Sequence, residues 1–229
     1  MSILGTSKGY IAPTKIEWSR AKSAVTSLVK ETNGNNVAKA ASRYATAMKS
    51  DGFLKSTMPK TVSSIIGLAR NIRSNGITDA LNSIGRNDLI GKTTDEIFNE
   101  LLLYYTNNGA TKEDSLALDA LSLALKKLGI IDLEDLGNID EEKFLREILA
   151  EFLELNFEFR FYEKISKTKS PVETQGILKE MKGYLRGSIY EELTIEKINE
   201  IDFGNLAGEQ YITQMCVDAF SVLEDLYEE

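Results

Sequence analysis

At four expected helix starts in this chain a hydroxyl side chain precedes a carboxylate by three residues, which is the spacing of a helix capping box. The four segments are Thr14-Lys-Ile-Glu17, Thr93-Thr-Asp-Glu96, Thr111-Lys-Glu-Asp114 and Ser170-Pro-Val-Glu173. In a capping box the two side chains accept hydrogen bonds from backbone N–H groups that the first helical turn leaves unpaired. Pro171 also stands where proline best fits a helix. Because the chain has no long alternating run of β-branched residues, these signals predict an all-α fold.

We expect about nine helices forming an elongated bundle, separated by residues that tolerate a positive φ. The expected breaks are Asn33-Gly-Asn-Asn36, Asn75-Gly76, Asn107-Asn-Gly109 and Gly129. The predicted helices cover approximately 15–31, 36–49, 58–75, 78–84, 94–107, 112–128, 140–167, 171–191 and 206–227.

Two of these helices carry most of the large apolar side chains. Six leucines between 116 and 128 predict that helix 112–128 is a central, largely buried strut. Helix 140–167 is unusually aromatic, and rings at helical spacing indicate a core or a subunit interface. Its aromatic residues are Phe144, Phe152, Phe157, Phe159, Phe161 and Tyr162.

Composition excludes several kinds of chemistry. The 229 residues contain no histidine and one cysteine, Cys216, so Ser-His and Cys-His nucleophiles and Cys/His zinc sites are ruled out. Cys216 lies in an apolar helical segment and is expected to be a small buried group. We predict no catalytic residue, no metal and no cofactor. A hydrolase that uses carboxylates alone is a further alternative, which needs a convergent acidic pocket.

The ends and the hydropathy of the chain predict a cytoplasmic protein. No apolar run approaches the roughly 20 residues of a membrane-spanning helix, so no membrane contact is expected. The start Met1-Ser2-Ile3-Leu4-Gly5 lacks the features of a secretory signal.

Charge divides the chain by position. Residues 1–90 carry 13 Lys and Arg against 5 Asp and Glu, whereas residues 91–229 carry 14 against 30. The sign changes at Gly85-Arg-Asn-Asp-Leu-Ile-Gly91. We therefore predict a flexible N-terminal tail over 1–13, a basic helical lobe over 14–90 and an acidic helical lobe over 91–229.

The basic lobe is the expected surface for an anionic partner. Its candidate interaction residues are Arg43, Lys49, Arg70 and Arg73. The basic residues are spread over several helices with few aromatic side chains among them, so nucleic-acid binding is possible but not favoured. Docking on an acidic protein surface, which includes this chain's own C-terminal part, explains the pattern better.

Two loops resemble ligand-binding motifs but fail on spacing. Gly91-Lys92-Thr93 lacks the glycine at 86 that a phosphate loop requires, because residue 86 is Arg86, and a hydroxyl capping the next helix is the simpler interpretation. The segment 132–140 has the carboxylates of a calcium loop, but Leu136 and Lys143 occupy ligand positions. A solvated acidic loop is expected there.

The N-terminal half resembles a known family. The features are Gly5-Thr6-Ser7, Pro13 near Trp18, the helix Asn36-Val-Ala-Lys-Ala-Ala-Ser-Arg-Tyr44, Ile77-Thr-Asp-Ala-Leu-Asn-Ser-Ile-Gly85, Leu89-Ile-Gly91-Lys92 and Asp95-Glu-Ile-Phe98. From about Gly5 to Gly129 this pattern is similar to QatB, a component of the Qat bacterial antiphage defence system. Unlike the family pattern, the tail before the first helix is short and not proline-rich.

The resemblance implies a helical, non-enzymatic protein that works with an ATPase, a QueC-like enzyme and a TatD-like nuclease of the same defence operon. We therefore expect an adaptor or scaffold that binds one of these enzymes. Its tail, with Gly5, Thr6 and Ser7, is the candidate segment for binding or modification by the QueC-like enzyme. The alternative is a nucleic-acid-binding subunit that delivers DNA or RNA to a partner nuclease.

Overall fold

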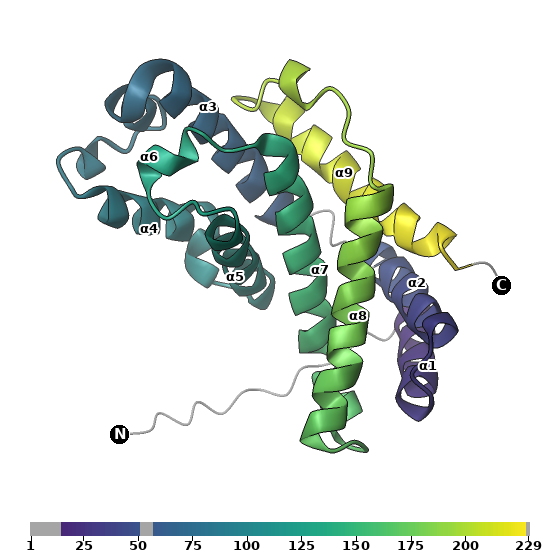
Figure 1. Ribbon diagram of the computed structural model, residues 1–229. Coiled ribbons are helices and arrows are strands. Elements are labelled where there is room, and N and C mark those ends of the chain that lie inside the picture. The colour runs from purple at the N-terminus through teal and green to yellow at the C-terminus, as the bar shows by residue number, and fades with distance from the viewer. Residues whose placement is uncertain (1–14, 51–56, 228–229) are drawn as a thin grey trace, which may run out of the picture.

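The structure is a computed structural model that describes residues 15–50 and 57–227 (Figure 1). Within these ranges all regular structure is helical and no β-strand occurs, which confirms the predicted all-α fold. The helices are α1 (Ile16–Lys30), α2 (Gly34–Ser50), α3 (Thr57–Ser83), α4 (Thr94–Tyr105), α5 (Lys112–Lys127), α6 (Leu133–Leu136), α7 (Glu141–Ser166), α8 (Pro171–Glu192) and α9 (Leu206–Asp225).

Three of the four predicted capping boxes are confirmed. The hydroxyls of Thr93, Thr111 and Ser170 begin α4, α5 and α8, and each accepts a hydrogen bond from the backbone N–H three residues on. The carboxylates at those third positions each accept a hydrogen bond from the backbone N–H of the capping residue. The first helix differs, since α1 begins after Lys15 without a side-chain cap. Thr14 lies outside the described residues.

A glycine divides the third helix as the sequence predicts. Gly76 has φ 82° and ψ 170°, a backbone conformation that side-chain-bearing residues rarely adopt. Helical hydrogen bonding resumes after it, so α3 runs to Ser83 with a sharp change of direction. The predicted helices 58–75 and 78–84 are therefore the two arms of one kinked element.

Helix α7 is the centre of the fold, and α5, α8 and α1 pack around it (Figure 1). The aromatic residues of α7 predicted to be core are mostly buried there. The Tyr44 ring meets the Phe157 ring edge-on at 5.4 Å, and the Tyr44 hydroxyl donates to the Leu153 carbonyl oxygen at 3.2 Å. Phe159 and Tyr162 are the exceptions, because both are exposed on the outer side of α7. The last helix, α9, packs on α2 and α3.

Two expectations about burial were wrong. Helix α5 is not the central strut, because it buries Leu121 and Leu125 but leaves Leu123 exposed, and α7 takes the central place instead. The acidic segment 132–140 is not simply a solvated loop. It contains the short helix α6, whose Leu133 and Leu136 are fully buried and anchor it on the core.

The buried apolar side chains form a single cluster that includes Trp18 near the start of α1 and Leu223 near the end of α9. The boundary predicted near residue 90 falls between α3 and α4, and the division into a basic and an acidic lobe stays a prediction. None of the helices in the described ranges combines the length and apolar character that a bilayer crossing requires.

Candidate functional site

A cleft of about 900 Å³ opens between α3, the C-terminal end of α4 and the segment that leads into α9. One face of α3 contributes Ser64, Gly67 and Asn71, which are small or neutral. Two segments supply aromatic walls, with Tyr104 at the end of α4 and Phe203, whose side chain is only 5% exposed, before α9. A lining of rings and neutral polar groups, to which Lys60 and Glu209 add two charges, suits contact with a peptide segment that carries both apolar and polar side chains.

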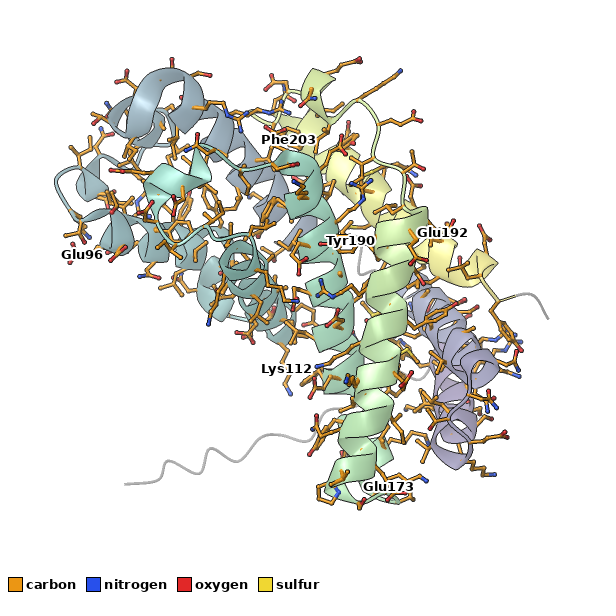
Figure 2. All side chains as sticks on the ribbon, in the orientation of Figure 1. Glu96, Lys112, Glu173, Tyr190, Glu192 and Phe203 are labelled. Atoms are coloured by element: carbon orange, nitrogen blue, oxygen red, sulfur yellow. The ribbon has the colours of Figure 1, made fainter. Side chains whose placement is uncertain are left out.

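Phe203 is held against α3 by close backbone packing (Figure 2). A Cβ on Gly67 would lie 2.8 Å from the Phe203 carbonyl oxygen, and a Cβ on Gly208 would lie 2.8 Å from the Phe203 Cα. The Arg70 guanidinium carbon lies 4.8 Å from the centre of the Phe203 ring, and the Tyr211 ring meets it edge-on at 6.0 Å. Two glycines and two flanking side chains therefore fix this wall of the cleft.

The opposite wall has one partly buried and one exposed tyrosine. The rings of Tyr104 and Tyr105 lie 5.3 Å apart, and the Thr61 hydroxyl donates to the Tyr105 carbonyl oxygen at 2.7 Å. Burial, together with the neighbouring Tyr104, raises the pKa of Tyr105 to about 12, so its hydroxyl stays protonated at neutral pH. Tyr104 is 53% exposed and is available to a partner.

Arg70, one of the predicted interaction residues, is a clamp between three segments. Its Nε donates to Glu141 Oε1 at 2.9 Å and its Nη2 to Glu141 Oε2 at 2.5 Å. It also donates to the carbonyl oxygens of Ile198 and Ile201. The hydrogen bond that it donates to Glu141 raises the pKa of Arg70. Arg70 thus joins α3, the start of α7 and the segment before Phe203.

Arg73 lies one turn further along α3 and reaches the same carboxylate. Its Nη1 is 3.5 Å from Glu141 Oε1, and its other nitrogens donate to the carbonyl oxygens of Gly137 and Ile139 at 2.8 and 2.9 Å. These bonds hold the chain that connects α6 to α7. The structure therefore brings Arg70 and Arg73 together on one carboxylate.

The other predicted residues lie elsewhere. Lys49 on α2 forms an ion pair with Glu224 on α9, with 2.6 Å between Nζ and Oε2. Arg43 lines a groove between α1 and α2. Lys49, Arg70 and Arg73 each pair with a glutamate from the C-terminal part of this chain, and binding of a partner by the four stays a prediction. The tail residues 5–7 lie outside the described residues.

Sequence reasoning missed a buried ionic network between α7 and α8. Arg186 on α8 contacts three glutamates of α7 at once, with nitrogen–oxygen distances of 2.7 Å to Glu147, 2.5 Å to Glu151 and 2.8 Å to Glu154. Lys127 of α5 reaches Glu147 and Glu151, so the network joins three helices. The spacing of these glutamates places them on one face of α7, but an acidic face usually indicates solvent.

The pKa values of Glu147 and Glu154 in this network are shifted in opposite directions. Burial alone would raise the pKa of Glu147, but hydrogen bonds from Tyr190 and Arg186 outweigh it and lower the pKa to about 2. Burial dominates at Glu154 and raises its pKa despite the nearby Arg186. With two cations bound to them, these carboxylates serve as a structural joint between helices and do not form an open acid–base pair.

The loops that resemble ligand sites are used as helix caps. Thr93 caps α4, and Lys92 beside it pairs with Glu100 at 2.7 Å. Asp132 and Asp140 cap α6 and α7. Across the described residues no cluster of His, Cys, Asp and Glu has the arrangement of a metal site.

Comparison with known proteins gives one match. A family model described as Qat anti-phage system associated protein QatB matches residues 55–223, which covers most of the chain. This range includes both walls of the cleft and the ionic network on α7 and α8. Searches of curated proteins and of solved structures give no match.

Proposed function

The chain belongs to the QatB family of the Qat antiphage system, and on that premise we propose that it is a non-catalytic adaptor that holds a partner enzyme of the system. The observation that carries the proposal is the cleft between Tyr104 and Phe203, with its aromatic walls and small-residue floor. A segment of the partner would lie along α3, with its apolar side chains against the two aromatic walls.

The chemistry of the charged residues supports an adaptor over an enzyme. The strongest interactions of Arg70 and Arg186 bind helices together within the chain. The cleft lining includes Lys60 and Glu209 but no pair of carboxylates among the described residues. A binding surface needs shape and mixed polarity, both of which the cleft has, whereas a hydrolase that uses carboxylates alone needs two of them in one cleft.

For the identity of the partner we retain the expectation from the family resemblance. A QueC-like enzyme, or the ATPase or nuclease of the same defence operon, is the proposed partner. We also propose that the tail with Gly5, Thr6 and Ser7 is bound or modified by the QueC-like enzyme. Clipping ahead of Gly5 would expose an α-amine there, and an α-amine, with an unperturbed pKa of roughly 7.7–8.0, is a better nucleophile near pH 7 than a lysine.

The cleft is tested by co-purification from cells that carry the native gene neighbourhood. Tyr104→Asp and Ser64→Arg change the wall and the floor of the cleft, and we expect both to remove the co-purifying enzyme. Tyr162→Ala is the matched control, because Tyr162 is an exposed tyrosine on α7. Retention of every partner by both cleft variants would contradict the proposal.

The tail is tested separately by intact-mass analysis of the chain co-expressed with its neighbours. A mass shift located in the first residues, together with loss of defence when residues 2–9 are deleted, is the expected result. An unmodified mass and full defence by the deleted form would rule out a role for the tail. These results would not bear on the proposal that the cleft binds a partner.

A further inference from the structure

A second groove, of about 510 Å³, lies between α1 and α2. On one side α1 presents three serines at four-residue spacing, and on the other α2 presents two cations one turn apart. Arg20 adds a third cation from α1. The polar lining is Ser19, Ser23, Ser27, Arg20, Lys39 and Arg43.

The charge of this groove stands out in a chain whose net charge is −8. None of the described residues that line it is acidic. Lys39 contacts the Tyr227 ring, with 5.8 Å from Nζ to the ring centre, and the described residues provide no salt bridge to Lys39 or to Arg20. Elsewhere on the molecule the cations Lys49, Arg70 and Arg186 hold glutamates. Arg20 and Lys39, next to serine hydroxyls and with no acidic residue in the described lining, create a local positive potential suited to an anion.

We propose that the α1–α2 groove binds an acidic peptide segment of a partner protein. The serine row from Ser19 to Ser27 extends about 12 Å along α1, which matches roughly four residues of extended chain. The carboxylates of that segment would face Arg20 and Lys39, and the Ser19 and Ser23 hydroxyls would donate to carboxylate or carbonyl oxygens. Ile16, which is exposed at one end of the groove, gives an apolar contact for a flanking side chain.

A peptide fits this groove better than a nucleic acid. Binding of single strands relies on aromatic side chains on which bases stack, and the described lining residues include no aromatic ring. The short row of charges also neutralises few phosphates, whereas two or three carboxylates are enough to occupy it.

This groove is independent of the cleft between Tyr104 and Phe203. Helices α1 and α2 precede residue 55, so they lie outside the range that matches the family model. A binding assay on this chain alone needs no partner enzyme. The groove can therefore fail to bind the peptide while the cleft still binds its partner enzyme. Equally, the groove can bind the peptide when the cleft binds no partner.

The test is fluorescence anisotropy with a labelled hexaglutamate peptide and, in parallel, a labelled six-nucleotide thymidine single strand. We expect the peptide to bind the full chain at low salt and to dissociate as salt is added. The double variant Arg20→Glu with Lys39→Glu should weaken peptide binding at least tenfold. The control Lys126→Glu with Lys179→Glu makes the same change in net charge at two exposed lysines of α5 and α8, and should leave affinity within about twofold.

A second variant protects the test against misfolding of the first. Ser23→Asp places one carboxylate in the groove at an exposed helical position. This variant should also weaken peptide binding, while circular dichroism shows an intact fold. Equal binding by the groove variants and the control, no peptide binding at about 1 mM, or binding of the oligonucleotide in preference to the peptide would each overturn the proposal.

Discussion

Arg70 and Glu141 form a two-pronged ion pair across 71 positions of the chain, with Glu141 almost completely buried. The guanidinium satisfies both carboxylate oxygens and two carbonyl oxygens of the segment before Phe203. One side chain therefore positions the start of α7 and supports a wall of the cleft.

Replacing Arg70 should destabilise the protein strongly. In Arg70→Ala the Glu141 carboxylate keeps only the longer contact to Arg73, so we expect a loss of about 3 kcal/mol in the free energy of unfolding. Thermal denaturation should show a fall of roughly 6–12 °C in Tm. Lys143→Ala removes the exposed pair with Asp140 and should change stability by less than about 0.5 kcal/mol. Equal losses in the two variants would show that the clamp has no special role.

Gly67→Ala should distort the cleft. The new Cβ would meet the Phe203 carbonyl oxygen at 2.8 Å, so the segment or the helix must shift, at about 1–3 kcal/mol. Gly183→Ala is the matched control, because a Cβ there meets no atom within 4 Å and alanine favours the helix by up to about 1 kcal/mol. In urea denaturation the unfolding midpoint should therefore fall for Gly67→Ala and rise for Gly183→Ala. A higher midpoint for Gly67→Ala would contradict the packing described.

The free energy of unfolding should fall in acid, because Glu147 becomes protonated. Its pKa is lowered to about 2 in the folded chain, so its contribution is present above its ordinary pKa of 4.5 and is lost as pH falls toward 2. Tyr190→Phe removes one hydrogen-bond donor to this carboxylate and should reduce stability by about 1–2 kcal/mol at pH 7. Urea unfolding at pH 7 and pH 3 should show a smaller acid loss in Tyr190→Phe than in the parent chain or in Tyr162→Phe. An unchanged acid loss would argue against the role assigned to Tyr190.

The thiol of Cys216 should be unreactive in the folded protein. Burial raises its pKa to about 12, so almost no thiolate exists between pH 7 and pH 9. A thiol-specific chromogenic reagent should modify it at a rate that follows unfolding, with full reaction in denaturant. Rapid modification of the folded chain would show that the helix around Cys216 opens readily.

The helix boundaries were largely predictable because their causes are local. The Thr93, Thr111 and Ser170 caps depend on side chains three residues away, and the bend at Gly76 depends on one residue without a side chain. The short helix α6 was missed because its four residues are ordered by burial of Leu133 and Leu136 against distant helices, and no local pattern records that contact.

Tertiary pairing explains what the sequence did not reveal about charge. In the sequence alone the three glutamates Glu147, Glu151 and Glu154 have the pattern of a solvated helical face. In the folded chain Arg186, more than thirty residues later, donates hydrogen bonds to all three. Similarly, the sequence identifies Arg70 as basic but does not show that Glu141 lies opposite it. The cleft walls come from segments about one hundred residues apart, so the cleft appears only when the chain has folded.

The packing of α9 on α2 has a consequence for how the protein is made. The Thr46 hydroxyl donates to Glu224 at 2.8 Å across 178 positions, and Lys49 pairs with the same carboxylate. At a synthesis rate of about 5–20 residues per second, the ribosome needs roughly 10 to 35 s to supply that partner. During this interval the apolar face of α2 that α9 will cover is open to other proteins. The order of translation thus gives any subunit made nearby a time window in which to meet the nascent chain.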